Sequence, residues 1–223
     1  MAVQTGEGTI EIIYGASSIP AGPRMYTGYL ARPDASGEWP TVVVFGDEPK
    51  PSSAVKHHCR MLARHGIAAI APDFTLDPDG NARIARAAGA FIGNPSGEWS
   101  NGQFGFGVVS FGVGVAGATS FAASDGRVVA VAIVGGSIDD TSADDLAMAS
   151  VPTLFVGSRG DATIDIDASV AHKDRLATAT FVIYPSAPTG FWSDDADEFS
   201  EEVYEDVVDR LVGFFSEQLP PRI

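Results

Sequence analysis

The chain has one cysteine, few basic residues and no long apolar run, and each shortage excludes a class of protein. Cys59 alone can form neither an internal disulfide nor a cysteine zinc cluster, and we expect it to be a buried or half-buried structural thiol. Lys and Arg number 14 against 29 Asp and Glu, so neither nucleic-acid backbones nor acidic membrane surfaces are expected partners. No apolar run reaches the roughly 18 residues of a membrane-spanning helix, and no secretory signal pattern begins the chain. We expect a soluble, cytoplasmic protein without a metal or cofactor, either a monomer or a homodimer.

The 223 residues are 45% hydrophobic, enough to bury a sizeable core, and apolar strands alternate with helical patterns along the chain. We expect an antiparallel pair at residues 9–16 and 25–33, and further strands at 41–45, 67–71, 106–110, 128–134, 153–156 and 180–184. Helices are expected at residues 53–64, 82–91, 113–123 and 169–176, and around 203–215 in the acidic C-terminal segment. This alternation predicts an α/β fold, a mostly parallel sheet with helices on both faces, forming one domain over residues 1–223.

The most informative segment is FGVVSFGVGV at residues 106–115, an apolar strand followed by a glycine-rich turn. It has the outline of a nucleophile elbow, the strained strand-to-helix turn that exposes a catalytic Ser or Cys, with small residues two positions away on either side. Setting the apex at Gly112 makes Ser110 and Gly114 those flanking residues. The position of the nucleophile then holds a residue without a side chain.

The order of the segments resembles the dienelactone hydrolase family of α/β-hydrolases, and the resemblance covers nearly the whole chain. The strings that carry it are GYLARPDASGEWPTVVVF at residues 28–45, ARHGIAAIAPDF at 63–74, VPTLFVGSRGDATI at 151–164 and YPSAPTGFW at 184–192. The resemblance implies an α/β-hydrolase fold and a triad of Cys or Ser, Asp and His.

Carried over residue by residue, that triad is incomplete. Gly112 stands at the nucleophile, and Asp161 is available as the acid, one residue later after its glycine than usual. Thr189 takes the position of the histidine in the string from Tyr184 to Phe191. The resemblance therefore implies that two of three catalytic groups are replaced.

Two replacements for the missing groups are conceivable. Ser110 can be counted as the apex, but Val108 would then crowd the upstream small position, and the serine would still need a base. The four histidines fall on or beside predicted helices, so we interpret them as packing or surface residues: His57, His58, His65 and His172.

Other candidates lie where strands end. Gly46, Asp47 and Glu48 follow residues 41–45, and a carboxylate there can be a general base if burial raises its pKa; a solvated loop is the alternative. Backbone N–H groups at Gly112 and Val113 can hold an oxyanion. Phe191 and Trp192 either wall a ligand cleft beside Thr189 or pack against the sheet. The segment from residue 73 to 102 matches no chemical pattern.

Three functions remain open. The first, which we favour, is a dienelactone hydrolase-like protein that acts non-hydrolytically on a small organic molecule, by cyclisation, isomerisation or elimination, using Asp47 and Asp161. The second is an ester or lactone hydrolase built on Ser110 and Asp161. The third is a pseudoenzyme that binds a ligand or partner without catalysis.

Overall fold

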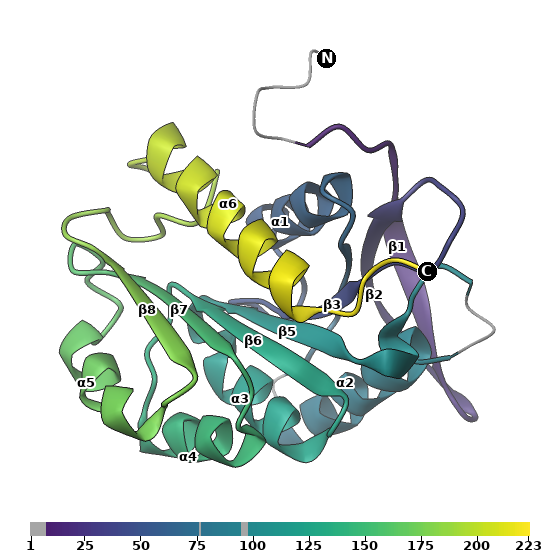
Figure 1. Cartoon of the computed structure of the whole chain (residues 1–223), viewed down its shortest axis with the longest axis horizontal. Helices are drawn as coiled ribbons and strands as arrows, with labels where there is room; N and C mark the ends of the chain where they lie inside the picture. The colour runs from purple at the N-terminus through teal and green to yellow at the C-terminus, as the bar shows by residue number, and fades with distance from the viewer. Residues whose placement is uncertain (1–7, 76, 95–97) are drawn as a thin grey trace.

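An eight-stranded sheet forms the centre of the computed structural model, which describes residues 8–75, 77–94 and 98–223 (Figure 1). The strand order is β1-β2-β4-β3-β5-β6-β7-β8, with β1–β2 and β2–β4 antiparallel and the remaining pairs parallel. The strands are β1 (Ile12–Ala21), β2 (Arg24–Pro33), β3 (Thr41–Phe45), β4 (Ala68–Pro72), β5 (Phe106–Phe111), β6 (Val128–Val134), β7 (Thr153–Ser158) and β8 (Ala179–Tyr184).

Helices cover both faces of this sheet. Figure 1 shows α1 and α6 on one face and α2, α3, α4 and α5 on the other. Their bounds are α1 (Ser53–Arg64), α2 (Pro78–Ile92), α3 (Val115–Ser124), α4 (Asp140–Ala149), α5 (Ile166–Ala171) and α6 (Glu201–Gln218); short 3₁₀ turns lie at Gly102–Phe104, Gly112–Gly114 and Lys173–Arg175. The predicted α/β fold class is confirmed.

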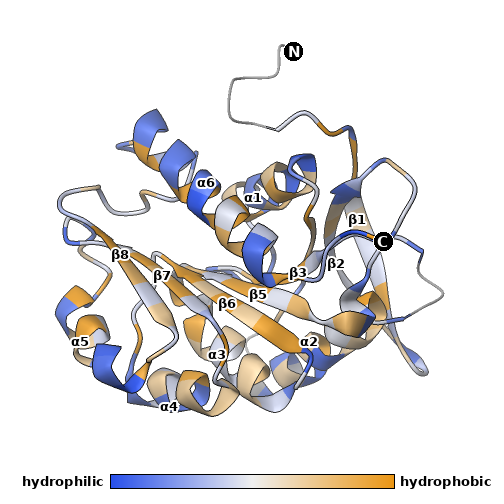
Figure 2. Cartoon of the chain, in the orientation of Figure 1, coloured by the Kyte–Doolittle hydropathy of each residue, from blue (hydrophilic) through white to orange (hydrophobic). Residues whose placement is uncertain are grey.

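The central strands are mostly apolar because helices cover them on both sides (Figure 2). Every residue of β3, β4, β5 and β7 is buried. The helices are amphipathic instead: α6 buries Val207, Leu211 and Phe215 on one side and exposes its acidic residues on the other. Burial thus follows the period of each element.

Sequence periodicity located most elements to within a few residues. The predicted helix at 53–64 coincides with α1, and the predicted strand at 128–134 coincides with β6. One helix, α4, was missed. It is short and buries only Ser142, Ala143 and Leu146, too few apolar positions for a clear helical period; the signal that was available is its N-cap, Asp139, which accepts a hydrogen bond from Ser142 N at 2.7 Å.

Candidate functional site

Gly112 occupies the turn between β5 and α3. Its φ is +55°, a left-handed conformation that residues with a side chain rarely adopt. A Cβ built there would lie 3.0 Å from Asp47 Cβ and 3.8 Å from Trp192 Cζ2. The backbone therefore has the elbow shape, and Asp47 and Trp192 take up the space beside its apex.

The helix that follows is pressed against the end of β3. A Cβ on Gly114 would come within 2.8 Å of the Phe45 carbonyl oxygen, so this close approach requires glycine. Gly112 and Val113 are the first residues of the 3₁₀ turn that leads into α3. Their backbone N–H groups have no acceptor within the helix, because no helical carbonyl precedes them. Val113 itself is 81% exposed.

Ser110 lies inside β5, beside Phe45 of β3, and has no exposed surface. In the described part of the chain its Oγ is a buried atom without a hydrogen-bond partner. An attacking group must touch its substrate, so Ser110 is not accessible as a nucleophile in this conformation. The strand runs one residue further than an apex at Ser110 would allow.

Removing this hydroxyl should not weaken the fold. We expect Ser110→Ala to leave the free energy of unfolding unchanged or to raise it by about 1 kcal/mol. On folding, a buried hydroxyl without a partner loses its hydrogen bonds to water, and no hydrogen bond in the protein compensates for them. Urea unfolding of both proteins measures this. A loss of stability would mean that Oγ makes an interaction absent from this conformation.

Asp47 faces a cavity of about 270 Å³ at the carboxyl end of β3. The side chain is half-buried, and Ser52 Oγ donates a hydrogen bond to its Oδ1 at 3.3 Å. Gly46 and Glu48 also line this cavity, Glu48 as an exposed residue. The structure thus brings Asp47 next to the elbow and leaves Glu48 at the rim.

Asp161 and Thr189 meet on the loops after β7 and β8. Asp161 is buried, its Oδ1 accepts hydrogen bonds from Thr163 N at 2.9 Å and Oγ1 at 2.6 Å, and its Oδ2 accepts one from Gly190 N at 3.1 Å. Thr189 is exposed, and its Oγ1 accepts from Ala162 N at 3.1 Å. Both carboxylate oxygens of Asp161 therefore hold the backbone on either side of Thr189 and Ala162 in place.

Phe191 and Trp192 are both buried, at 2% and 6% exposure. Trp192 packs on Phe111, with ring centroids 5.1 Å apart, and Phe191 meets Tyr184 edge-on at 5.5 Å. Both side chains therefore pack against the sheet, which is one of the two roles predicted for them. Trp192 also lies beside the elbow, since a Cβ built on Gly112 would be 3.8 Å from its Cζ2.

His58 lies behind the elbow in the packing between α1, α6 and the chain after β8. It is 1% exposed, stacks on Phe111 at 4.4 Å, and donates from Nε2 to the Trp192 carbonyl oxygen at 2.6 Å. Burial lowers the pKa of its imidazole from 6.5 to about 4, against the opposing effect of that hydrogen bond. His57 pairs with Asp194 at the surface. His58 is thus a packing residue, whereas His57 is a half-buried residue beside Asp194.

This buried imidazole makes stability depend on pH. Between pH 6.5 and about 4 the unfolded chain binds a proton at His58 that the folded chain does not, so the free energy of unfolding falls as the pH is lowered through this window. The full difference corresponds to about 3 kcal/mol. Urea unfolding at pH 7 and 4.5 should give a smaller pH dependence for His58→Gln than for wild type. Equal dependence in wild type and His58→Gln would contradict this assignment.

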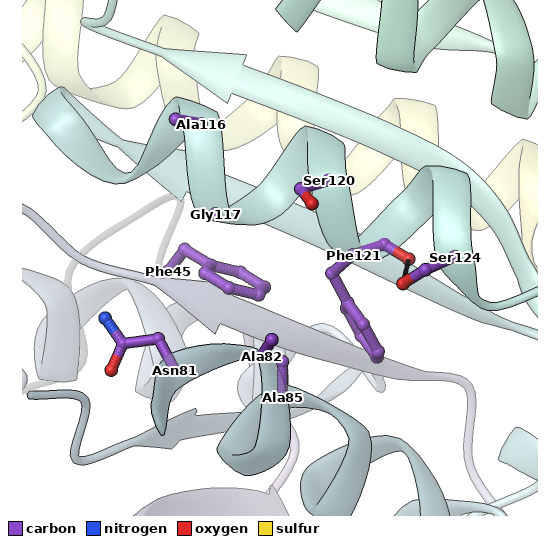
Figure 3. A pocket seen from close by; sticks show the side chains of 9 residues that line it. All are labelled: Phe45, Asn81, Ala82, Ala85, Ala116, Gly117, Ser120, Phe121 and Ser124. Atoms are coloured by element: carbon purple, nitrogen blue, oxygen red, sulfur yellow. Dashed lines mark hydrogen bonds between the residues drawn. The ribbon is translucent and has the colours of Figure 1, made fainter. Parts of the chain in front are cut away.

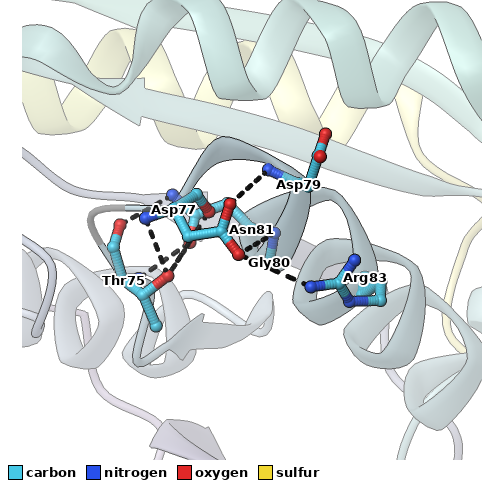
Figure 4. Close-up of polar contacts among 6 residues, drawn as sticks. All are labelled: Thr75, Asp77, Asp79, Gly80, Asn81 and Arg83. Carbon is cyan, nitrogen blue, oxygen red and sulfur yellow. Dashed lines mark hydrogen bonds and ion pairs between the residues drawn. The ribbon is translucent and has the colours of Figure 1, made fainter.

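The loop before α2 and the first turn of that helix contribute residues that sequence reasoning missed. Phe74, Thr75 and Asn81 line the cavity in front of Asp47. The amide of Asn81 accepts from Thr75 N at 2.7 Å and donates to Thr75 O at 2.9 Å, while Asp77 caps the helix (Figure 4). The Asp77–Pro78 pair could have indicated the start of this helix from the sequence, because proline favours the first helical position.

Within the described ranges, no three His, Cys, Asp or Glu side chains are grouped as metal ligands. No helix among the described residues is long and apolar enough to cross a membrane. Cys59 is buried, as predicted, and burial raises the pKa of its thiol to about 12.

The strand order, the elbow and the loop positions define the α/β-hydrolase fold, as the sequence predicted. No protein-family model and no curated protein matches the sequence. Solved structures do match: a dienelactone hydrolase described as putative, from Klebsiella pneumoniae, has a TM-score of 0.78 at 22% identity, covering 93% of this chain and 99% of that one. A dienelactone hydrolase-like promiscuous phosphotriesterase from metagenomic libraries and a dienelactone hydrolase from Anabaena variabilis have TM-scores of 0.77 and 0.75, each at 19% identity and covering 94% of this chain and 99% of theirs.

Proposed function

We propose that this chain is a dienelactone hydrolase-like protein that moves a proton within a small unsaturated carbonyl compound, such as a lactone, without hydrolysing it. The observation that carries the proposal is the elbow itself. Gly112 has the backbone conformation of the apex, and the space beside it is bounded by the carboxylate-bearing residue Asp47.

Hydrolysis through an acyl-enzyme needs an attacking group and a base beside it. Gly112 offers no attacking atom, Thr189 offers no titratable group, and Ser110 is buried within β5. The loss of both partners argues against the hydrolase alternative.

The remaining groups suit proton transfer at carbon. Asp47 takes a proton from the carbon next to the carbonyl, and the electron pair of that C–H bond moves onto the carbonyl oxygen as an enolate. The backbone N–H groups of Gly112 and Val113 stabilise the enolate oxygen. The proton held by the half-buried Asp47 exchanges with solvent, and Asp47 then delivers a proton, or a deuteron in D₂O, at the far end of the conjugated system, which yields an isomer and restores the carboxylate. Asp161 acts as a positioning residue that fixes the loop bearing Trp192.

The test compound is α-angelica lactone, a five-membered lactone in which the proton leaves C3 and returns at C5. Proton NMR in D₂O should reveal β-angelica lactone with deuterium at C5, formed faster than in buffer, and no excess levulinate from ring opening. Enzyme-dependent levulinate that disappears in Ser110→Ala would support the hydrolase instead. Binding of the lactone without either product would favour the non-catalytic alternative.

A further inference from the structure

A groove runs between α2 and α3, beside the elbow cavity (Figure 3). Its volume is about 350 Å³. The rings of Phe45 and Phe121 project into it, and Ala85 lies below them on α2; all three are nearly fully buried and form its floor. The groove is therefore apolar at its base.

The walls of this groove are short side chains on two facing helices. Ala82 stands on α2, and Ala116, Gly117 and Ser120 stand opposite on α3 (Figure 3). A Cβ on Gly117 would come 3.2 Å from the Phe45 ring, so the glycine leaves this ring room beside α3. Short walls over an aromatic floor leave space that hydrocarbon can fill.

The groove and the elbow cavity are neighbours, since Phe45, Asn81 and Gly117 line both. Asn81 Oδ1 accepts hydrogen bonds from Thr75 N and Oγ1, and its Nδ2 donates to Thr75 O, so most of the hydrogen-bonding capacity of this amide is used by Thr75 rather than by a ligand along the shared wall. The exposed side chain of Val113 adds an apolar contact on the elbow side. A molecule held at the elbow can thus extend along Phe45 into the groove.

We propose that the ligand of this protein carries an unbranched alkyl tail that lies between α2 and α3 while its carbonyl head lies at the elbow. The volume supports a tail of several carbons, because a dry cavity of about 150 Å³ already accepts benzene. A neutral head fits better than a carboxylate beside Asp47 and Glu48 in a chain with a net charge of −15. The position of the head rests on the proposed function; the tail site is tested by binding alone.

The experiment measures the dissociation constants of saturated γ-lactones whose side chains have one, two, four, six or eight carbons, by titration calorimetry. Each added methylene should tighten binding by about fourfold until the groove is filled. Ala82→Phe on α2 and Ser120→Phe on α3 should reduce this gain to less than twofold per methylene. Ala90→Phe places the same side chain at an exposed position of α2 that does not line the groove, and should keep the full gain.

Three outcomes decide the matter. Equal affinity across the series in wild type, or the same gain in Ala82→Phe and Ser120→Phe as in wild type, would overturn the tail site. If the gain persists in both wild type and Asp47→Asn but the wild type does not isomerise α-angelica lactone, the proposed chemistry is refuted and the tail site is retained. Thermal unfolding of each variant confirms that a loss of binding is not a loss of folding.

Discussion

Asp47→Asn is expected to slow the isomerisation of α-angelica lactone by about 100-fold or more, since a positioned general base contributes roughly 10²–10⁴ to a proton transfer. The amide keeps the shape of the side chain and its hydrogen bond from Ser52, but it cannot accept the C3 proton. The effect should fall on kcat, because the lactone still contacts Phe74 and Val113 in the cavity. Deuterium incorporation at C5 should fall by the same factor.

The control is Asp174→Asn, which removes one negative charge at an exposed site on the 3₁₀ turn before β8, at the amino-terminal ends of the strands. It should isomerise the lactone at the wild-type rate. Full activity in Asp47→Asn would refute the role of this carboxylate. Equal losses in the two variants would point to net charge instead.

Phe215→Ala should produce the largest loss of stability, about 3–5 kcal/mol in the free energy of unfolding. Phe215 has no exposed surface. Its ring packs α6 against the sheet at Gly107 of β5, where a Cβ would lie 2.6 Å from the ring. Removing the ring leaves a cavity between α6 and β5 that neither backbone can close. Urea unfolding monitored by circular dichroism measures the change.

The adjacent Phe214 is only partly buried, and Phe214→Ala should cost less than half as much. A second comparison isolates the contact with Gly107. Gly107→Ala should destabilise the wild type but cost less in the Phe215→Ala background, since its Cβ then meets no ring. Additive effects of these two substitutions would show that the ring and Gly107 do not constrain each other.

The fold was predictable because its signals are local. Buried parallel strands such as TVVVF read as short apolar runs, and α1 and α6 repeat apolar residues at helical spacing. The helix α4 escaped because its short apolar face is too weak a pattern. The mostly parallel direction of the sheet was inferred from general rules of connection and is observed, whereas the order of the strands was not predicted.

The site was predictable only as a set of positions. Gly112, Asp161 and Thr189 could be aligned by their order along the chain, but the hydrogen bond from Gly190 N to Asp161 Oδ2 joins residues 29 positions apart, and no local pattern indicates it. Likewise, the cavity wall formed by Phe74, Thr75 and Asn81 lies in a segment without a chemical pattern, and its position beside Asp47 depends on the tertiary structure.

By itself, the sequence determined the order of strands and helices, and its resemblance to a known family predicted that Gly112 and Thr189 stand at the nucleophile and histidine positions. Only the tertiary structure decided that Gly112 forms the apex of the elbow, that Ser110 is buried within β5, and that Asp47 lies beside Gly112. The physical reason is that element type follows from the periodicity of neighbouring residues, whereas exposure and reach depend on how separate elements pack. The groove between α2 and α3 exists for the same reason, because short side chains on two helices leave space only where those helices face each other.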